Sequence, residues 1–246
     1  MTVQVVIYTL LSICANLMGG LVLLIRKDWS NKSLKSFLAL CTGFLFSLTI
    51  FDLIPETIEM GGTSSTLYIF AGFLLLFLIQ TFYKSISCTQ HKKHQNHITT
   101  VSSSMAGILI HSFFDGLLIV STFLFNQYIG IAVLLGIMLH KFFDGFILST
   151  ITYTYYRNSK KLFIPISLLI LSTLLGIGVP FALSESSLFT GKSILVSFLS
   201  ITAGIFLYIS TVDLITLSNL KNDRIAGFFF LFGISVFILL HSFSHY

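Results

Sequence analysis

Long apolar runs separated by short polar segments make up most of this chain. A helix of about 20 apolar residues crosses a hydrocarbon core of about 30 Å. Eight of the runs are long enough, and they cover residues 3–25, 36–58, 64–83, 100–125, 128–156, 162–184, 193–220 and 225–240. The runs lack the apolar–polar alternation of membrane β-strands. The pattern therefore predicts an all-α integral membrane protein, a single domain over residues 1–246 with eight transmembrane helices.

The composition agrees with this class of protein. Hydrophobic residues make up 55% of the chain and charged residues only 9%, whereas about a quarter of the residues are charged in soluble domains. The first run has no basic segment before it, so we expect a retained helix and not a cleaved signal. The three cysteines are scattered, which favours neither a disulfide framework nor a thiolate metal site.

The basic residues predict how the helices are oriented. Most of the fourteen Lys and Arg residues lie in alternate connections between the predicted helices, and cytoplasmic loops carry such an excess. We therefore expect these connections in the cytosol and both termini outside. The net charge of +5 then reflects topology and attraction to anionic lipid, and it does not indicate nucleic-acid binding. The residues concerned are Arg26, Lys27, Lys32, Lys35, Lys84, Lys92, Lys93, Arg157, Lys160, Lys161, Lys221 and Arg224.

Two copies of one polar signature interrupt the central apolar runs. They read HSFFDG from His111 and HKFFDG from His140. Each copy places an imidazole and a carboxylate, of Asp115 or Asp144, at positions i and i+4, so both project from one helix face. From the predicted helix ends, the two histidines lie about 16 and about 18 Å into the membrane at 1.5 Å per residue. Both motifs are therefore expected near the middle of the bilayer.

Ionisable groups at that depth are costly, so we expect them to have a function. Imidazole and carboxylate suit zinc and other first-row divalent ions, and a site without thiolate releases its ion readily. We predict that His111, Asp115, His140 and Asp144 supply up to four ligands to one ion. The alternative for each residue is a polar contact between two helices. That alternative is weakened because both acids would need partners, and Lys141 is the permanent cation of these motifs.

The second and seventh predicted helices resemble each other. CTGFL from Cys41, followed by DLI from Asp52, aligns with TAGIF from Thr202, followed by DLI from Asp213. The two helices are expected to run in opposite directions, which is the inverted repeat of many transporters. The predicted fold is thus a 3+2+3 inverted-repeat arrangement. Asp52 is expected in the outer third of the membrane and Asp213 in the inner third, as acids of a transport pathway. The alternative for both is helix capping or a surface position.

These features resemble the ZIP (zinc- and iron-regulated transporter-like) family of divalent-metal transporters over essentially the whole chain. HSFFDG is similar to the family's fourth-helix motif, HKFFDG to its fifth-helix motif, and DLIPE from Asp52 to the end of its second helix. The resemblance implies transport of Zn²⁺ toward the cytosol, with Fe²⁺, Mn²⁺ and Cd²⁺ as further candidate substrates and no permanent cofactor. We expect a multi-pass protein of the cell membrane, and the sequence leaves a homodimer open.

Histidines also occur in the predicted cytosolic loop over residues 84–100. His91, His94 and His97 lie where the family often carries a histidine-rich segment. Short tracts of this kind bind metals, so we expect metal capture on the cytosolic side. The alternative is an ordinary solvated loop.

Two residues depart from the family pattern. Many members have a carboxylate or amide after each motif histidine, which gives a second metal position, but this chain has Ser112 and Lys141 there. On a helical wheel Lys141 and Asp144 lie about 60° apart, so the ammonium is expected to bond Asp144. We therefore predict a site for a single metal, with Ser112 and Lys141 beside the transport pathway.

Other residues predict packing and bending of the helices. Gly43, Gly116, Gly145 and Gly204 are expected to let helices approach closely. Pro55 is expected to interrupt the backbone hydrogen bonds of the second helix.

Other functions would use the same groups differently. An intramembrane zinc hydrolase would need about three protein ligands and an open position, and His241 would have to join the two central histidines. A metal-sensing scaffold would bind metal without transporting it. We expect a transporter and not an enzyme because of the repeat. The sequence has no nucleotide-binding loop, so movement is expected to follow the ion gradient or the membrane potential.

Overall fold

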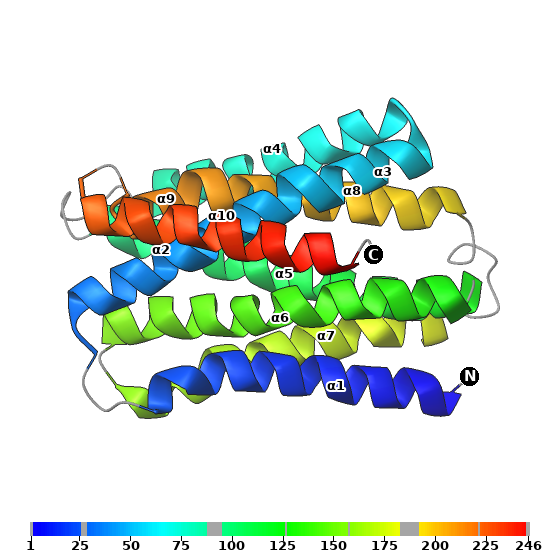
Figure 1. The fold of residues 1–246 in the computed structure, drawn as a ribbon, viewed down its shortest axis with the longest axis horizontal. Helices are drawn as coiled ribbons and strands as arrows, with labels where there is room; N and C mark the ends of the chain where they lie inside the picture. The colour runs from blue at the N-terminus through cyan, green and yellow to red at the C-terminus, as the bar shows by residue number, and fades with distance from the viewer. Residues whose placement is uncertain are drawn as a thin grey trace. The chain divides into compact units, whose positions relative to one another are not determined.

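Every regular element in the described part of the chain is helical (Figure 1). The structure is a computed structural model that describes residues 2–25, 29–87, 95–125, 127–156, 158–182, 192–220 and 222–244. The elements are α1 (Thr2–Leu21), η1 (Val22–Leu24), α2 (Asn31–Leu48), η2 (Thr49–Leu53), α3 (Ile54–Gly61), α4 (Ser64–Ser87), α5 (Gln95–Phe125), α6 (Gln127–Tyr156), η3 (Ser159–Leu162), α7 (Phe163–Ala182), α8 (Lys192–Tyr208), η5 (Ile209–Asp213), α9 (Leu214–Leu217) and α10 (Arg224–Ser244).

Six helical stretches within the described residues are long and apolar enough to cross a membrane. They cover Gln4–Leu24, Asn31–Gly61, Ser64–Phe82, Phe163–Pro180, Val196–Leu217 and Arg224–Ser242. The prediction of a multi-pass, all-α membrane protein is therefore confirmed. The remaining two predicted spans fall on α5 and α6, which have 31 and 30 residues and carry the polar motifs. That these two also cross the bilayer stays a prediction.

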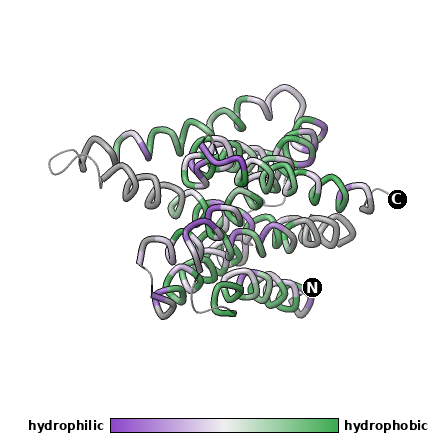
Figure 2. Tube along the Cα trace, turned by 60° about the vertical axis from the view of Figure 1, so that its left-hand side comes forward, coloured by the Kyte–Doolittle hydropathy of each residue, from purple (hydrophilic) through white to green (hydrophobic). Residues whose placement is uncertain are grey.

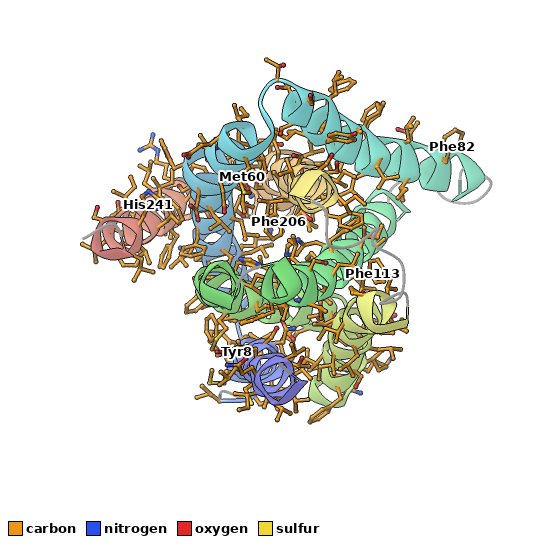
Figure 3. The ribbon with its side chains drawn as sticks, turned by 90° about the vertical axis from the view of Figure 1, so that its right-hand side faces the viewer. Tyr8, Met60, Phe82, Phe113, Phe206 and His241 are labelled. Atoms are coloured by element: carbon orange, nitrogen blue, oxygen red, sulfur yellow. The ribbon has the colours of Figure 1, made fainter. Side chains whose placement is uncertain are left out.

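Hydrophobic residues run along most of the described helices, and the most hydrophilic residues are confined to short stretches (Figure 2). Many of the large hydrophobic side chains are exposed. Leu67 is 73% exposed and Phe228 is 67% exposed. Figure 3 shows Phe82, which is 65% exposed, projecting from α4. Extensive exposed apolar surface of this kind is unfavourable in water and suits contact with lipid tails.

The chain divides into two compact units. Unit 1 comprises Met1–Trp29 and Ile108–Leu199, and unit 2 comprises Ser30–Gly107 and Ser200–Tyr246. In unit 1, α1 packs along α6, and both contact α7 (Figure 1). In unit 2, α2 packs along α10 (Figure 1). Both polar motifs fall in unit 1, whereas the two aligned acidic segments fall in unit 2.

Glycines bring neighbouring helices into backbone contact within each unit. A Cβ atom added to Gly145 of α6 would lie 2.2 Å from the carbonyl oxygen of Asn16 in α1. The same addition at Gly116 of α5 would lie 2.2 Å from the carbonyl oxygen of Thr173 in α7. In unit 2, Gly43 and Gly204 make equally close approaches to Phe230 and Ile69. The prediction that these four glycines serve helix packing is confirmed.

The two aligned helices both contain a π-helical segment. In the first, η2 ends just before α3, whose first turn contains Pro55. Proline has no N–H group and cannot continue the α-helical ladder, so Pro55 accounts for the interruption that the sequence predicts there. In the second, Ser210 donates a hydrogen bond to the carbonyl of Phe206, and Thr211 to that of Leu207. Hydroxyl bonds to the preceding turn bend helices, and this π-helix was not predicted.

Some helix boundaries differ from the predicted spans. α2 begins at Asn31, before the predicted start, because Ser30 Oγ accepts a hydrogen bond from the Ser33 amide at 3.0 Å and caps the helix. α4 continues to Ser87 and α5 begins at Gln95, so both ends of the predicted loop over residues 84–100 are helical.

Candidate metal centre

Two helices, α5 and α6, supply all four predicted ligands, and the four residues belong to unit 1. His111 and Asp115 lie one turn apart on α5, and His140 and Asp144 lie one turn apart on α6. All four residues are buried, with exposed fractions of 0 to 4%. The motif spacing therefore places an imidazole and a carboxylate on the facing side of each helix.

The distances among these groups fit the requirements of a small metal ion. His111 Nε2 lies 3.0 Å from Asp115 Oδ2 and 3.4 Å from Asp144 Oδ2. His140 Nε2 lies 3.6 Å from Asp115 Oδ2. One ligand atom from each of the four residues lies within 4.8 Å of the others. Two ligands of a tetrahedral zinc ion lie about 3.3 to 3.6 Å apart, so the cluster needs little rearrangement to bind one.

Asp144 gives the cluster an unsatisfied negative group. Neither of its carboxylate oxygens accepts a hydrogen bond from the described residues, although His111 Nε2 lies within 3.4 Å of Oδ2. Burying a carboxylate without hydrogen bonds is costly. A divalent ion would supply both the positive charge and the missing coordination.

The structure corrects the predicted partner of Lys141. Its Nζ atom lies 2.9 Å from Asp115 Oδ2 on α5, and it makes no ion pair with Asp144. The ammonium also donates hydrogen bonds to Ser112 Oγ at 2.9 Å and to Thr173 Oγ1 at 3.1 Å. The prediction was wrong because it considered one helix only. The long side chain leaves α6 and reaches acceptors on α5 and α7.

Asp52 and Asp213, the predicted pathway acids, have different surroundings in unit 2. Asp52 lies in η2 and is partly exposed. Asp213 lies in η5 and is fully buried. Gln80 of α4 donates a hydrogen bond from Nε2 to Asp213 Oδ1 at 3.0 Å, and the Tyr208 hydroxyl donates to Gln80 Oε1.

The π-helix explains how Tyr208 and Asp213 reach the same glutamine. In an α-helix, residues five positions apart point about 140° away from each other. In a π-helix, i→i+5 hydrogen bonding places such residues about one turn apart. Both side chains can then face Gln80 on α4.

Sequence reasoning did not identify Thr173 or Gln80. Both lie in largely apolar predicted spans with no recognisable motif, and their partners come from other helices. Most of the predicted cytosolic capture tract lies outside the described residues. His91 and His94 lie outside the described residues, and for His97 the structure describes only its place in the backbone of α5.

Comparison with known proteins identifies the family of this chain. No match was found among curated protein sequences. The family model described as ZIP zinc transporter matches residues 87–241. The match covers more than half of the 246 residues and includes both motifs of the buried cluster. The chain therefore belongs to the ZIP family of zinc transporters.

Proposed function

We propose that this protein carries zinc toward the cytosol through a single mid-membrane site formed by His111, Asp115, His140 and Asp144. Family membership supports metal transport. The observation that carries the site assignment is the buried cluster, in which four ligand atoms lie within 4.8 Å of one another.

The chemistry of the cluster suits binding that can be reversed. It offers two imidazoles and two carboxylates and no thiolate. These ligands bind zinc and related divalent ions. Fe²⁺, Mn²⁺ and Cd²⁺ remain further candidate substrates, and no permanent cofactor is required.

Lys141 supports a site for a single ion. Its ammonium contacts Asp115 Oδ2 and Ser112 Oγ, which lie where many relatives are expected to hold a second metal. A second divalent ion beside that positive charge would be repelled. We therefore expect one bound zinc ion per chain.

We propose that the transporter spans the cell membrane eight times, as a 3+2+3 inverted repeat with both termini outside. The distribution of Lys and Arg supports this orientation. In that topology Asp52 lies toward the outside and Asp213 toward the cytosol, so the ion would meet them before and after the central site. The aligned π-helices η2 and η5 support an equivalent role for the two segments. A homodimer is compatible with this proposal.

The hydrolase alternative does not hold, because ZIP family transporters are not enzymes. Such a mechanism would also have needed His241. His241 lies in α10 of unit 2, where its ring stacks on Phe237 with centroids 5.4 Å apart.

Reconstitution in liposomes tests the proposed function. We expect the purified protein to let external Zn²⁺ reach a zinc-sensitive dye inside, and Asp144→Ala to abolish this uptake. Glu59→Ala, which removes an exposed carboxylate from α3, is the matched control and should transport normally. Zinc binding without uptake would instead support a metal-sensing scaffold.

We also propose that His91, His94 and His97 capture metal on the cytosolic side. Deletion of residues 91–97 should leave uptake largely intact, because a solvated loop of the kind that the sequence predicts there tolerates shortening. Metal bound on the cytosolic side should decrease. Complete loss of uptake in normally inserted protein would mean that the segment belongs to the transport pathway.

A further inference from the structure

The ammonium group of Lys141 has a complete set of acceptors. A lysine ammonium carries three N–H donors. The structure supplies three oxygens at 2.9 to 3.1 Å, from Asp115, Ser112 and Thr173. All four side chains are at most 1% exposed. A buried charge is tolerated when it is paired and hydrogen-bonded in this way, so the group is held as a cation.

Three helices of unit 1 contribute to this cage: α6 provides the lysine, α5 provides Ser112 and Asp115, and α7 provides Thr173. The Thr173 hydroxyl donates its own hydrogen to the Leu169 carbonyl at 3.0 Å. Its lone pairs therefore remain available to accept from Lys141. Gly116 places the α5 backbone close to that of Thr173, which lets α7 reach the motif helices.

The permanent cation changes the net charge of the metal site. Asp115 and Asp144 contribute two negative charges, and Lys141 contributes one positive charge. The histidines are neutral when they act as ligands. With Zn²⁺ bound, the site therefore carries one net positive charge, whereas the same site without the lysine charge would be neutral.

We infer that Lys141, held by Ser112 and Thr173, makes the zinc-loaded site a monocation whose translocation responds directly to the membrane potential. This inference rests on the proposed transport function and adds a role for α7. A potential that is negative inside pulls a positively charged loaded site inward. Thr173 is a positioning residue, since it acts on the site through the ammonium.

Zinc exchange at clamped potentials isolates the loaded site. Liposomes would contain saturating Zn²⁺ on both sides, and exchange of isotopic zinc would be followed while valinomycin and potassium gradients set the potential. A monocation that crosses the whole field is redistributed by up to about 50-fold at 100 mV. Accumulation of the zinc-loaded site on one side of the membrane would then slow zinc exchange by up to about fourfold, whichever side is negative. A neutral loaded site would exchange at the same rate at every potential.

Replacements of Lys141 separate charge from structure. Lys141→Met and Lys141→Gln remove the charge, and Gln retains hydrogen-bond donors in case Met impairs folding. We expect exchange in either neutral variant to become independent of potential, whereas Lys141→Arg should keep the parental dependence. Two outcomes would overturn the inference. In the first, a neutral variant binds zinc and its exchange depends on potential as in the parent. In the second, no neutral variant binds zinc but Lys141→Arg does.

Thr173 provides an independent test. Thr173→Val keeps the shape but removes an acceptor, so the ammonium is expected to shift toward the carboxylates and compete with zinc. Because the ammonium loses a hydrogen bond that held it away from the zinc ligands, we expect the zinc affinity of Thr173→Val to be about tenfold weaker. The dependence of exchange on potential should persist, and Thr173→Ser should restore the affinity. Unchanged zinc affinity in Thr173→Val would remove the positioning role.

The results distinguish this inference from the proposed function. If the parent protein binds no zinc or exchanges none, the proposed function fails. If the parent exchanges zinc at a rate that does not depend on potential, transport stands and the monocation inference fails.

Discussion

At the residue scale, the two acids of the central cluster are not equivalent. Asp115 contacts an ammonium and two imidazoles. Asp144 contacts one imidazole and accepts no hydrogen bond from the described residues. Removing Asp115 therefore leaves the buried ammonium of Lys141 without its counter-charge. Removing Asp144 leaves the Lys141–Asp115 pair in place.

We predict that Asp144→Ala abolishes zinc uptake and leaves the folded protein in the membrane. The reason is that it removes an anionic ligand from a site with few alternatives. Uptake into cells and the amount of inserted protein would be measured together. Uptake at the parental rate in normally inserted Asp144→Ala would show that the central site is assigned wrongly.

Asp115→Ala should lose uptake and also lose stability. Breaking a buried ion pair by removing one partner costs about 3 to 5 kcal/mol, because Lys141 would remain charged and buried. Thermal unfolding in detergent should therefore occur at a lower temperature in Asp115→Ala than in Asp144→Ala. Equal unfolding temperatures would argue against the Lys141–Asp115 pair.

At the element scale, backbone contact between helices positions the cluster. α1 meets α6 at Gly145, directly after Asp144, and α5 meets α7 at Gly116, directly after Asp115. Each motif therefore ends in a glycine against which another helix packs. That helix is α7 at Gly116 and α1 at Gly145. The close approach fixes the helices that hold the ligands.

We predict that Gly145→Ala destabilises the protein by about 1 to 3 kcal/mol, the usual cost of overpacking. The added methyl group would meet the Asn16 carbonyl oxygen at 2.2 Å, and backbone atoms cannot rotate away. Gly178→Ala on α7 is the matched control, since no atom of the described residues lies within 4 Å of its added Cβ. Thermal unfolding in detergent measures both, and equal behaviour of the two variants would contradict the packing.

Gln80 of α4 holds Asp213, the last residue of the π-helix η5, by a hydrogen bond. Gln80→Met should remove the hydrogen bond to buried Asp213, and a hydrogen bond to a charged group contributes about 1.5 to 3 kcal/mol. We expect lower stability and slower zinc uptake. The adjacent Thr81→Val is the control because the Thr81 hydroxyl is exposed and bonds only its own helix. Uptake and stability at parental levels in Gln80→Met would show that this bond does not position Asp213.

At the scale of the whole molecule, the ligands of the proposed site come from one compact unit and the proposed pathway acids from the other. The ion pairs and hydrogen bonds described for the site lie within unit 1. Residues far apart in the chain build this unit, since α1 packs against α6 and α7.

Labelling of single cysteines would test the predicted topology. In a variant without the native cysteines, Glu59→Cys at the end of α3 should react with an impermeant maleimide from outside. Asn222→Cys, between α9 and α10, should react only after the membrane is permeabilised. Reaction of both residues from the same side would overturn the orientation that the charge distribution predicts.

Much of this protein follows from its sequence alone. Length and hydropathy determine the helical membrane class because each segment must satisfy its own backbone hydrogen bonds in lipid. The i, i+4 spacing determines that each motif presents an imidazole and a carboxylate together. The glycines after Asp115 and Asp144 also signal close packing before any partner helix is known.

Tertiary structure decided which partners these groups meet. Helical spacing places Lys141 near Asp144, yet the ammonium reaches Asp115 on α5 and Thr173 on α7. In the same way, Gln80 and Asp213 are distant in the chain and adjacent in the fold. Local periodicity orients a side chain around its own helix axis, but the identity of its neighbour depends on how other helices pack, which no single segment encodes.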